Sequence, residues 1–298
     1  MDLEAMLQAH GVLVADGAWG TLLAQRGLPP GTAPEQWNLA RPGEVEAVAR
    51  AYVEAGAQIV LTNTFGGSPW KLAKAGLGGR AAEVNRRGAE LSKRAAGGRA
   101  LVFASVGPTG EFLAPLGTHA AADFEACFAE QIAACAQGGA DGLVLETMTA
   151  LEETLAALAA ARKAAPRLPV AACMTFDRGA RGYATMMGVA PERAARELAA
   201  AGADLVGSNC GSGIGPMVEV ARLMRAATDR PLWFKPNAGA PHLVDGKTVF
   251  RETPEEMAGR AADLIAAGAR VIGGCCGTTP AHIRALAAAC RRAANPAR

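Results

Sequence analysis

The sequence predicts a single (β/α)₈ barrel that occupies residues 1–298, and three observations support this fold. First, a Gly-Ala phrase recurs at Gly56, Gly139, Gly202 and Gly268, each time at the end of an Ala-rich amphipathic stretch. Second, a short apolar run follows each phrase, which is typical of a buried parallel strand after a helix that ends at glycine. Third, no linker or low-complexity tract divides the chain, and barrels of roughly 250 residues or more fold as one domain.

The spacing of these glycines sets the number of strands. The intervals between them are 83, 63 and 66 residues, about two βα units each, so each interval needs one further strand and another must precede the first. In chain order we expect strands at 12–14, 59–61, 101–104, 143–145, 170–174, 205–206, 232–234 and 271–272. An open doubly wound sheet is the alternative, but its usual Gly-rich dinucleotide turn does not match the segment 16–20.

Composition excludes several classes of function. Lys and Arg number 30 against 28 Asp and Glu, which gives no electrostatic reason to expect nucleic acid or an anionic membrane as a partner. No run of about 18 apolar residues could span a membrane, and the first residues do not resemble a secretion signal. Seven cysteines without disulfide-scaffold spacing indicate reduced thiols, so we expect a cytoplasmic protein.

Polar side chains follow the predicted strands at equivalent places. The seventh and eighth residues after the four recurrent glycines are Asn63 and Thr64, Glu146 and Thr147, Asn209 and Cys210, and Cys275 and Cys276. In a barrel these positions lie at the C-terminal rim, where active sites of this fold are built. Four separate segments therefore converge on one candidate site.

Three of the seven cysteines point to a metal. Glycines flank Cys275 and Cys276 and relax the backbone there, so both sulfurs can face one point, and Cys210 holds the equivalent place two units earlier. Three thiolates favour Zn²⁺, and three protein ligands leave a fourth position for a substrate, as in catalytic zinc sites. Cys127, Cys135, Cys173 and Cys290 are expected to be buried core residues instead. The alternatives are a phosphate-binding loop at 273–274, as in a barrel isomerase or lyase, and a metal-storage or interaction module without enzymatic activity.

Several motifs resemble those of the zinc-dependent homocysteine S-methyltransferases. They are Asp16-Gly17-Ala18-Trp19-Gly20-Thr21, Thr62-Asn63-Thr64-Phe65, Gly207-Ser208-Asn209-Cys210, Lys235-Pro236-Asn237-Ala238-Gly239 and Gly273-Gly274-Cys275-Cys276-Gly277-Thr278-Thr279-Pro280. The resemblance runs from about residue 12 to residue 285. The segment 235–239, with 245–249 after it, is most similar to the homocysteine-binding module of cobalamin-dependent methionine synthase and less similar to the betaine-using branch.

The resemblance implies roles for individual residues. Cys210, Cys275 and Cys276 would hold zinc, and Asn237 would take the fourth position in the absence of substrate. Asp16, the Gly17 backbone and Glu146 would hold the amino-acid end of homocysteine.

Charge leads to the same placement of the substrate. The two acids can accept hydrogen bonds from the substrate ammonium, and the N–H groups of Gly17 and Ala18 can bind its carboxylate. Asn63 and Thr64 either contact the substrate or only tie rim loops together. All four histidines, His10, His119, His242 and His282, are expected at the solvated surface, although His242 follows Asn237 and could approach the rim.

Zinc fits the chemistry that this resemblance implies. An alkyl thiol with a pKa near about 8.5 is mostly protonated at neutral pH, and a coordinated thiol is deprotonated, so zinc would supply the thiolate nucleophile. The resemblance leaves the methyl donor open. Methylcobalamin or methyltetrahydrofolate would have to come from another domain or protein. S-methylmethionine, S-adenosylmethionine or betaine would let the chain work alone.

Overall fold

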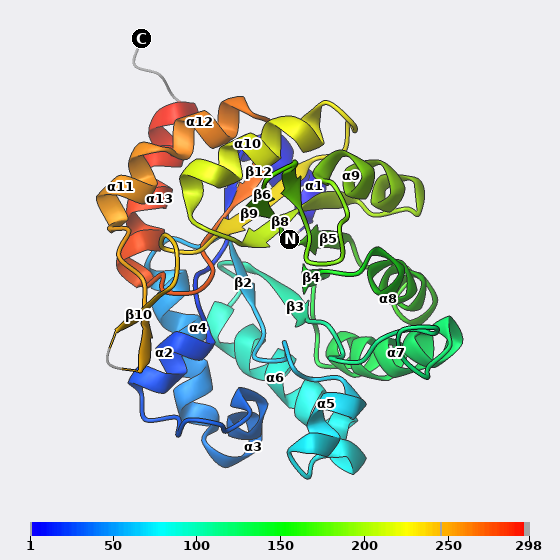
Figure 1. Ribbon diagram of the computed structural model, residues 1–298. Helices are drawn as coiled ribbons and strands as arrows, with labels where there is room; N and C mark the ends of the chain where they lie inside the picture. The colour runs from blue at the N-terminus through cyan, green and yellow to red at the C-terminus, as the bar shows by residue number, and fades with distance from the viewer. Residues whose placement is uncertain (1, 245, 295–298) are drawn as a thin grey trace.

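The computed structural model describes residues 2–244 and 246–294 and shows a closed eight-stranded parallel barrel (Figure 1). The neighbouring strands pair in the order β1-β12-β9-β8-β5-β4-β3-β2, and a parallel bridge from Ala15 to Ile59 closes the ring between β1 and β2. The barrel strands are β1 (Leu13–Val14), β2 (Ile59–Leu61), β3 (Leu101–Val106), β4 (Gly142–Met148), β5 (Val170–Met174), β8 (Leu205–Cys210), β9 (Leu232–Pro236) and β12 (Ala269–Ile272). All eight strands expected from the sequence are confirmed.

The helices lie outside the strands: the first precedes β1, the last follows β12, and the others occupy the connections between strands. They are α1 (Leu3–His10), α2 (Gly20–Gln25), η1 (Pro34–Gln36), α3 (Trp37–Ala40), α4 (Pro42–Glu54), α5 (Pro69–Lys74), η2 (Gly78–Arg80), α6 (Ala81–Ala96), α7 (Ala121–Gln137), α8 (Leu151–Ala164), α9 (Pro191–Ala200), α10 (Ile214–Arg225), α11 (Pro254–Gly259), α12 (Ala261–Ala266) and α13 (Pro280–Ala294). The recurrent Gly56, Gly139, Gly202 and Gly268 have φ of 102°, 90°, 96° and 103°, so each takes the positive-φ conformation expected of a glycine after a helix. None of the helices in these described ranges combines the length and the apolarity that a membrane span requires.

Strand side chains alternate between the barrel interior and the helix layer. Leu61, Phe103 and Trp233 belong to the interior cluster, whereas Val206 and Phe234 pack in the cluster that joins the sheet to the helices. Both sets are fully or almost fully buried, which explains why the strands read as unbroken apolar runs.

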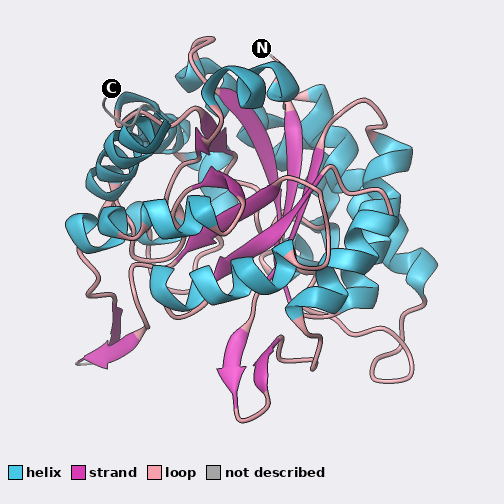
Figure 2. Cartoon of the chain, turned by 90° about the horizontal axis from the view of Figure 1, so that it is seen from above, coloured by secondary structure: helices cyan, strands magenta, loops and turns pink. Residues whose placement is uncertain are grey.

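Two hairpins extend the loops after β5 and β9. They are formed by β6 (Asp177–Gly179) with β7 (Gly182–Ala184), and by β10 (His242–Val244) with β11 (Lys247–Val249). Figure 2 shows both hairpins projecting from the same side of the barrel. Neither hairpin is predicted from the sequence, because the residues of these four short strands do not alternate between apolar and polar. Asp245, in one of the motifs noted above, lies outside the described residues.

The burial of the other cysteines and of the histidines can be compared with the expectations from the sequence. Cys127, Cys135, Cys173 and Cys290 are buried, as expected. His10 and His242 are exposed, but the expectation is wrong for His282, which is 6% exposed. Its ring nitrogens contact Thr279 and the carbonyl oxygen of Glu252, so hydrogen bonds replace the lost hydration.

Gly207 in β8 allows the barrel to close tightly beside the candidate site. A Cβ at this position would lie 1.8 Å from the carbonyl oxygen of Trp233 in β9. We therefore expect Gly207→Ala to displace a strand and to lower the free energy of unfolding by about 2 kcal/mol or more. Gly43→Ala is the matched control, because a Cβ there meets nothing within 4 Å. Equal thermal denaturation midpoints for the two variants would contradict this account of Gly207.

Candidate metal centre

Three cysteine sulfurs meet at the C-terminal rim of the barrel. The Sγ atoms of Cys210, Cys275 and Cys276 all lie within 4.8 Å of one another, and those of Cys210 and Cys275 are 3.2 Å apart. A tetrahedral zinc ion with Zn–S bonds of about 2.3 Å separates its sulfurs by about 3.8 Å, so the cluster is close to the size that zinc needs. The sulfurs from β8 and from the loop after β12 therefore come together as the sequence predicted.

Backbone strain is concentrated at this site. In the described part of the chain, Thr147 and Cys210 are the two non-glycine residues with positive φ, at 60° and 63°. Thr147 is the next-to-last residue of β4 and Cys210 the last residue of β8, and the Thr147 hydroxyl oxygen lies 3.9 Å from the Cys210 sulfur. Residues with a Cβ atom rarely adopt a positive φ, so the surrounding contacts must hold Thr147 and Cys210 in this conformation. The turn directs the Cys210 sulfur toward Cys275.

The end of β9 lies between the two cysteine loops. Asn237 N donates to Cys210 O over 3.1 Å, and Ala238 N donates to Cys276 O over 2.9 Å. The Asn237 Nδ2 donates to Gly211 O, whereas its Oδ1 is buried and has no hydrogen-bond partner among the described residues. A buried amide oxygen without a donor is costly, and a cation would satisfy it. Three thiolates and one amide oxygen are a donor set that a four-coordinate zinc ion accepts.

We expect Asn237→Ala to change the zinc coordination of the substrate-free protein and to leave part of the activity. The reason is that the substrate sulfur would displace this oxygen in any case. Zinc X-ray absorption without substrate measures the change, and Asn38→Ala provides a control, since Asn38 holds rim loops through Asn63 O and Val84 O. Identical spectra for wild type and Asn237→Ala would exclude Asn237 as a ligand.

The three thiols share charge even without a metal. Hydrogen bonds with Cys210 and then Cys275 lower the pKa of Cys276 to about 3, whereas the hydrogen bond with Cys275 is the main cause that raises the pKa of Cys210 well above its usual value. Asn209 Nδ2 lies 3.6 Å from Cys210 Sγ and 3.7 Å from Cys275 Sγ, so it donates toward both sulfurs. A divalent cation at this point would stabilise all three sulfurs as thiolates.

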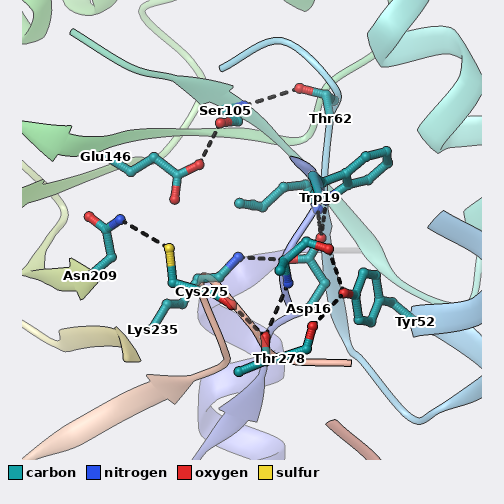
Figure 3. A network of polar contacts seen from close by, with 12 residues as sticks. Asp16, Trp19, Tyr52, Thr62, Ser105, Glu146, Asn209, Lys235, Cys275 and Thr278 are labelled. Atoms are coloured by element: carbon teal, nitrogen blue, oxygen red, sulfur yellow. Dashed lines mark hydrogen bonds and ion pairs between the residues drawn. The ribbon is translucent and has the colours of Figure 1, made fainter. Parts of the chain in front are cut away.

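Glu146 is the ionisable group of β4 that faces this cluster (Figure 3). It is 7% exposed, and its Oε1 accepts a hydrogen bond from the Ser105 hydroxyl over 2.5 Å. Burial raises the pKa of Glu146 to about 7, although the positive charge of Lys235 acts in the opposite direction. Its carboxylate is therefore only partly ionised near neutral pH, and a cation beside it would favour the ionised form.

Asp16 is buried and its carboxylate is already engaged by other groups of the protein. Its side chain is fully buried and forms an ion pair with Lys235 Nζ over 2.5 Å. The other carboxylate oxygen accepts from Leu61 N and Trp19 Nε1, at 2.7 and 2.8 Å. Both oxygens are thus engaged, which favours Glu146 over Asp16 as the acid that an incoming ammonium meets first.

Gly17 and Ala18 form the turn between Asp16 and the start of α2. The Ala18 N–H donates to Thr278 Oγ1 over 3.1 Å, so it already has an acceptor. A Cβ on Gly17 would lie 2.7 Å from Thr278 Oγ1 and 2.8 Å from the Tyr52 ring, which explains the glycine. Of the two N–H groups expected to bind a carboxylate, that of Gly17 is the less engaged.

Asn63 and Thr64 hold the rim loops together. Asn63 Nδ2 donates to Pro34 O and to Asn38 Oδ1, and the Thr64 hydroxyl donates to Ser105 O. Both side chains are buried. Of the two roles left open by the sequence, these contacts favour the tying of loops over direct contact with a substrate.

The glycine loop after β12 is poorly suited to phosphate. Gly273 N donates to Phe234 O, Gly274 N to Asp16 O and Cys275 N to Pro236 O, at 2.8–2.9 Å. A phosphate loop needs free backbone N–H groups, and these three bind neighbouring strands instead. The loop therefore serves to place the two cysteines.

Comparison with known proteins agrees with this geometry. The family model described as homocysteine S-methyltransferase matches residues 13–290. This chain belongs to the homocysteine S-methyltransferase family. Its relatives include a methionine synthase of Mycobacterium tuberculosis, 33% identical over 96% of this chain, and a homocysteine S-methyltransferase of Escherichia coli, 31% identical over 96% of this chain.

The two relatives differ in how much of their own length is matched. This chain spans 25% of the methionine synthase and 97% of the E. coli homocysteine S-methyltransferase. A crystal structure of the metallated E. coli homocysteine methyltransferase MmuM superposes with a TM-score of 0.82 and 27% identity, covering 96% of this chain and 99% of that one. The family and the barrel fold are therefore established on both sequence and structure.

Proposed function

We propose that the chain binds homocysteine through a zinc ion held by Cys210, Cys275 and Cys276 and transfers a methyl group to its sulfur, giving methionine. The observation that carries this proposal is the meeting of three sulfurs at the barrel rim, beside a buried Asn237 oxygen without a hydrogen-bond donor. When bound, zinc acts as a Lewis acid that keeps a coordinated thiol deprotonated at neutral pH.

The protein side chains position the substrate around that sulfur. Glu146 accepts the substrate ammonium, and the Gly17 N–H binds the carboxylate from the turn after β1. Asp16 is buried and holds Lys235. The nucleophile is the substrate sulfur, which attacks the methyl carbon of the donor in line with the bond to the leaving group. The electron pair of that bond departs with the demethylated donor.

We propose methylcobalamin as the methyl donor, bound by another domain or a separate protein. Two findings support this choice: the similarity of segment 235–239 to the homocysteine module of cobalamin-dependent methionine synthase, and the 33% identity to a methionine synthase of which this chain spans a quarter. A donor on a separate module needs an open approach to the sulfur cluster. The three cysteines are half-buried at the rim and offer such an approach.

A stand-alone reaction is the second candidate, in which S-methylmethionine, S-adenosylmethionine or betaine supplies the methyl group directly. The specific observation in its favour is that the chain spans 97% of the E. coli homocysteine S-methyltransferase.

An assay of the purified chain with zinc, homocysteine and each donor in turn distinguishes the candidates. We expect methionine from methylcobalamin. Methionine from S-methylmethionine but not from methylcobalamin would instead establish the stand-alone reaction. Tight zinc binding without saturable homocysteine binding, measured by calorimetry, would refute both candidates and would indicate a metal-storage role.

A further inference from the structure

Lys235 is a buried cation in the wall of the candidate site. It lies in β9, two residues after Trp233, and its side chain retains 2% exposure. Its ammonium forms an ion pair with the fully buried Asp16 carboxylate. The wall of the site therefore carries a positive charge where the site must receive a zwitterionic substrate.

The hydrogen bonds of this ammonium are incomplete. An ammonium group has three N–H donors. Within residues 2–244 and 246–294, the only hydrogen bond of Lys235 Nζ goes to Asp16 Oδ1, over 2.5 Å. Buried donors are nearly always paired, so the two remaining N–H groups call for an acceptor.

The position of Lys235 places those donors beside the reacting centre. The charges of Glu146 and Cys275 both act on Lys235, and those of Lys235 and Cys275 both act on Glu146. Figure 3 draws the Lys235 ammonium, the Glu146 carboxylate and the Cys275 sulfur in the same part of the site. A zinc-bound amino-acid thiol would hold its α-carbon substituents next to the sulfur cluster, within reach of these charged groups.

We propose that Lys235 is a specificity-determining residue that binds the α-carboxylate of the thiol substrate, while Glu146 binds its ammonium. This inference rests on the proposed function and adds to it the group that recognises the carboxylate. A carboxylate supplies the missing acceptor and pairs with the buried cation. The Gly17 N–H then assists as a second donor.

Three thiols separate the two recognition groups. Homocysteine carries both charged groups, 4-mercaptobutyrate only the carboxylate, and 3-aminopropane-1-thiol only the ammonium. Dissociation constants for the zinc-loaded protein are measured by calorimetry for wild type, Lys235→Met and Glu146→Gln. We expect Lys235→Met to weaken binding of homocysteine and 4-mercaptobutyrate by about ten- to a hundredfold and to leave 3-aminopropane-1-thiol within about twofold. Glu146→Gln should show the reverse pattern.

Loss of folding is controlled separately. Lys235→Met leaves Asp16 buried without its partner, which is strongly destabilising, so Asp16→Asn/Lys235→Met removes both charges together. Lys235→Arg keeps a cation and should restore most of the selectivity for carboxylate-bearing thiols. The zinc content of each purified variant is measured to confirm that the metal is retained.

Each outcome has a definite meaning. Equal weakening of all three thiols in the double variant, or no weakening of any, would overturn the role of Lys235 while the proposed function stands. If wild type binds zinc but none of the three thiols, the proposed function and this inference both fail.

Discussion

Cys210→Ala is expected to reduce zinc from about one ion per chain to nearly none and to abolish methyl transfer. Catalytic zinc sites use three protein ligands, and removing one of three thiolates leaves a site of two sulfurs with an unfavourable geometry. Cys210 comes from β8, while the other two cysteines come from the loop after β12. The variant therefore keeps cysteine ligands from only one of these two segments. Metal analysis of the purified variant and a methyl-transfer assay measure both effects.

Cys127→Ala is the matched control for this experiment. Cys127 is buried in α7 and is not part of the sulfur cluster, so its replacement should leave zinc content and activity unchanged. Full zinc occupancy in Cys210→Ala would contradict the assignment of Cys210 as a ligand.

Glu146→Gln is expected to keep zinc and to weaken homocysteine binding by about ten- to a hundredfold, equivalent to about 1.5–3 kcal/mol for a hydrogen bond to a charged group. The amide retains the shape of the side chain and can still accept from Ser105, so the fold should survive. Unchanged calorimetric binding would refute the role of Glu146.

The raised pKa of Glu146 adds a pH dependence to this prediction. With a pKa of about 7, Glu146 loses its charge as the pH falls from 8 to 6, and its attraction for an ammonium falls with it. Methionine is the best ligand for this test, because its thioether does not titrate. We expect weaker methionine binding at pH 6 than at pH 8 in wild type, and a flat profile in Glu146→Gln. The same slope in both proteins would exclude Glu146 as the source.

The barrel could be predicted from the sequence because its signals are local and repeated. Gly56, Gly139, Gly202 and Gly268 each end a helix at positive φ, and the apolar run after each becomes a buried strand. The convergence of Cys210 with Cys275 and Cys276 followed from the same spacing, since all carboxyl ends of barrel strands meet at one rim. Both features follow from the spacing of residues along the chain, which can be read directly from the sequence.

The ion pair between Asp16 and Lys235 could not be predicted from residue spacing in the same way. The Asp16–Lys235 pair joins residues more than 200 positions apart, and the distance between them depends on the closure of the ring between β1 and β9 through β12. One signal was available: Lys235 follows Trp233 by two residues in an apolar strand, so both side chains face the barrel interior, where a charge requires a partner. Asn209 is a predicted rim residue, but its donation toward two sulfurs depends on how the loops that carry Cys210 and Cys275 approach each other in space.

Zinc X-ray absorption of the wild-type protein, with and without homocysteine, measures whether three protein sulfurs hold the metal and leave a position for the substrate. We expect three sulfur neighbours at about 2.3 Å and one oxygen without substrate, and four sulfurs once homocysteine is added. Four sulfurs in both states, or a sulfur count that does not rise when homocysteine binds, would contradict this expectation.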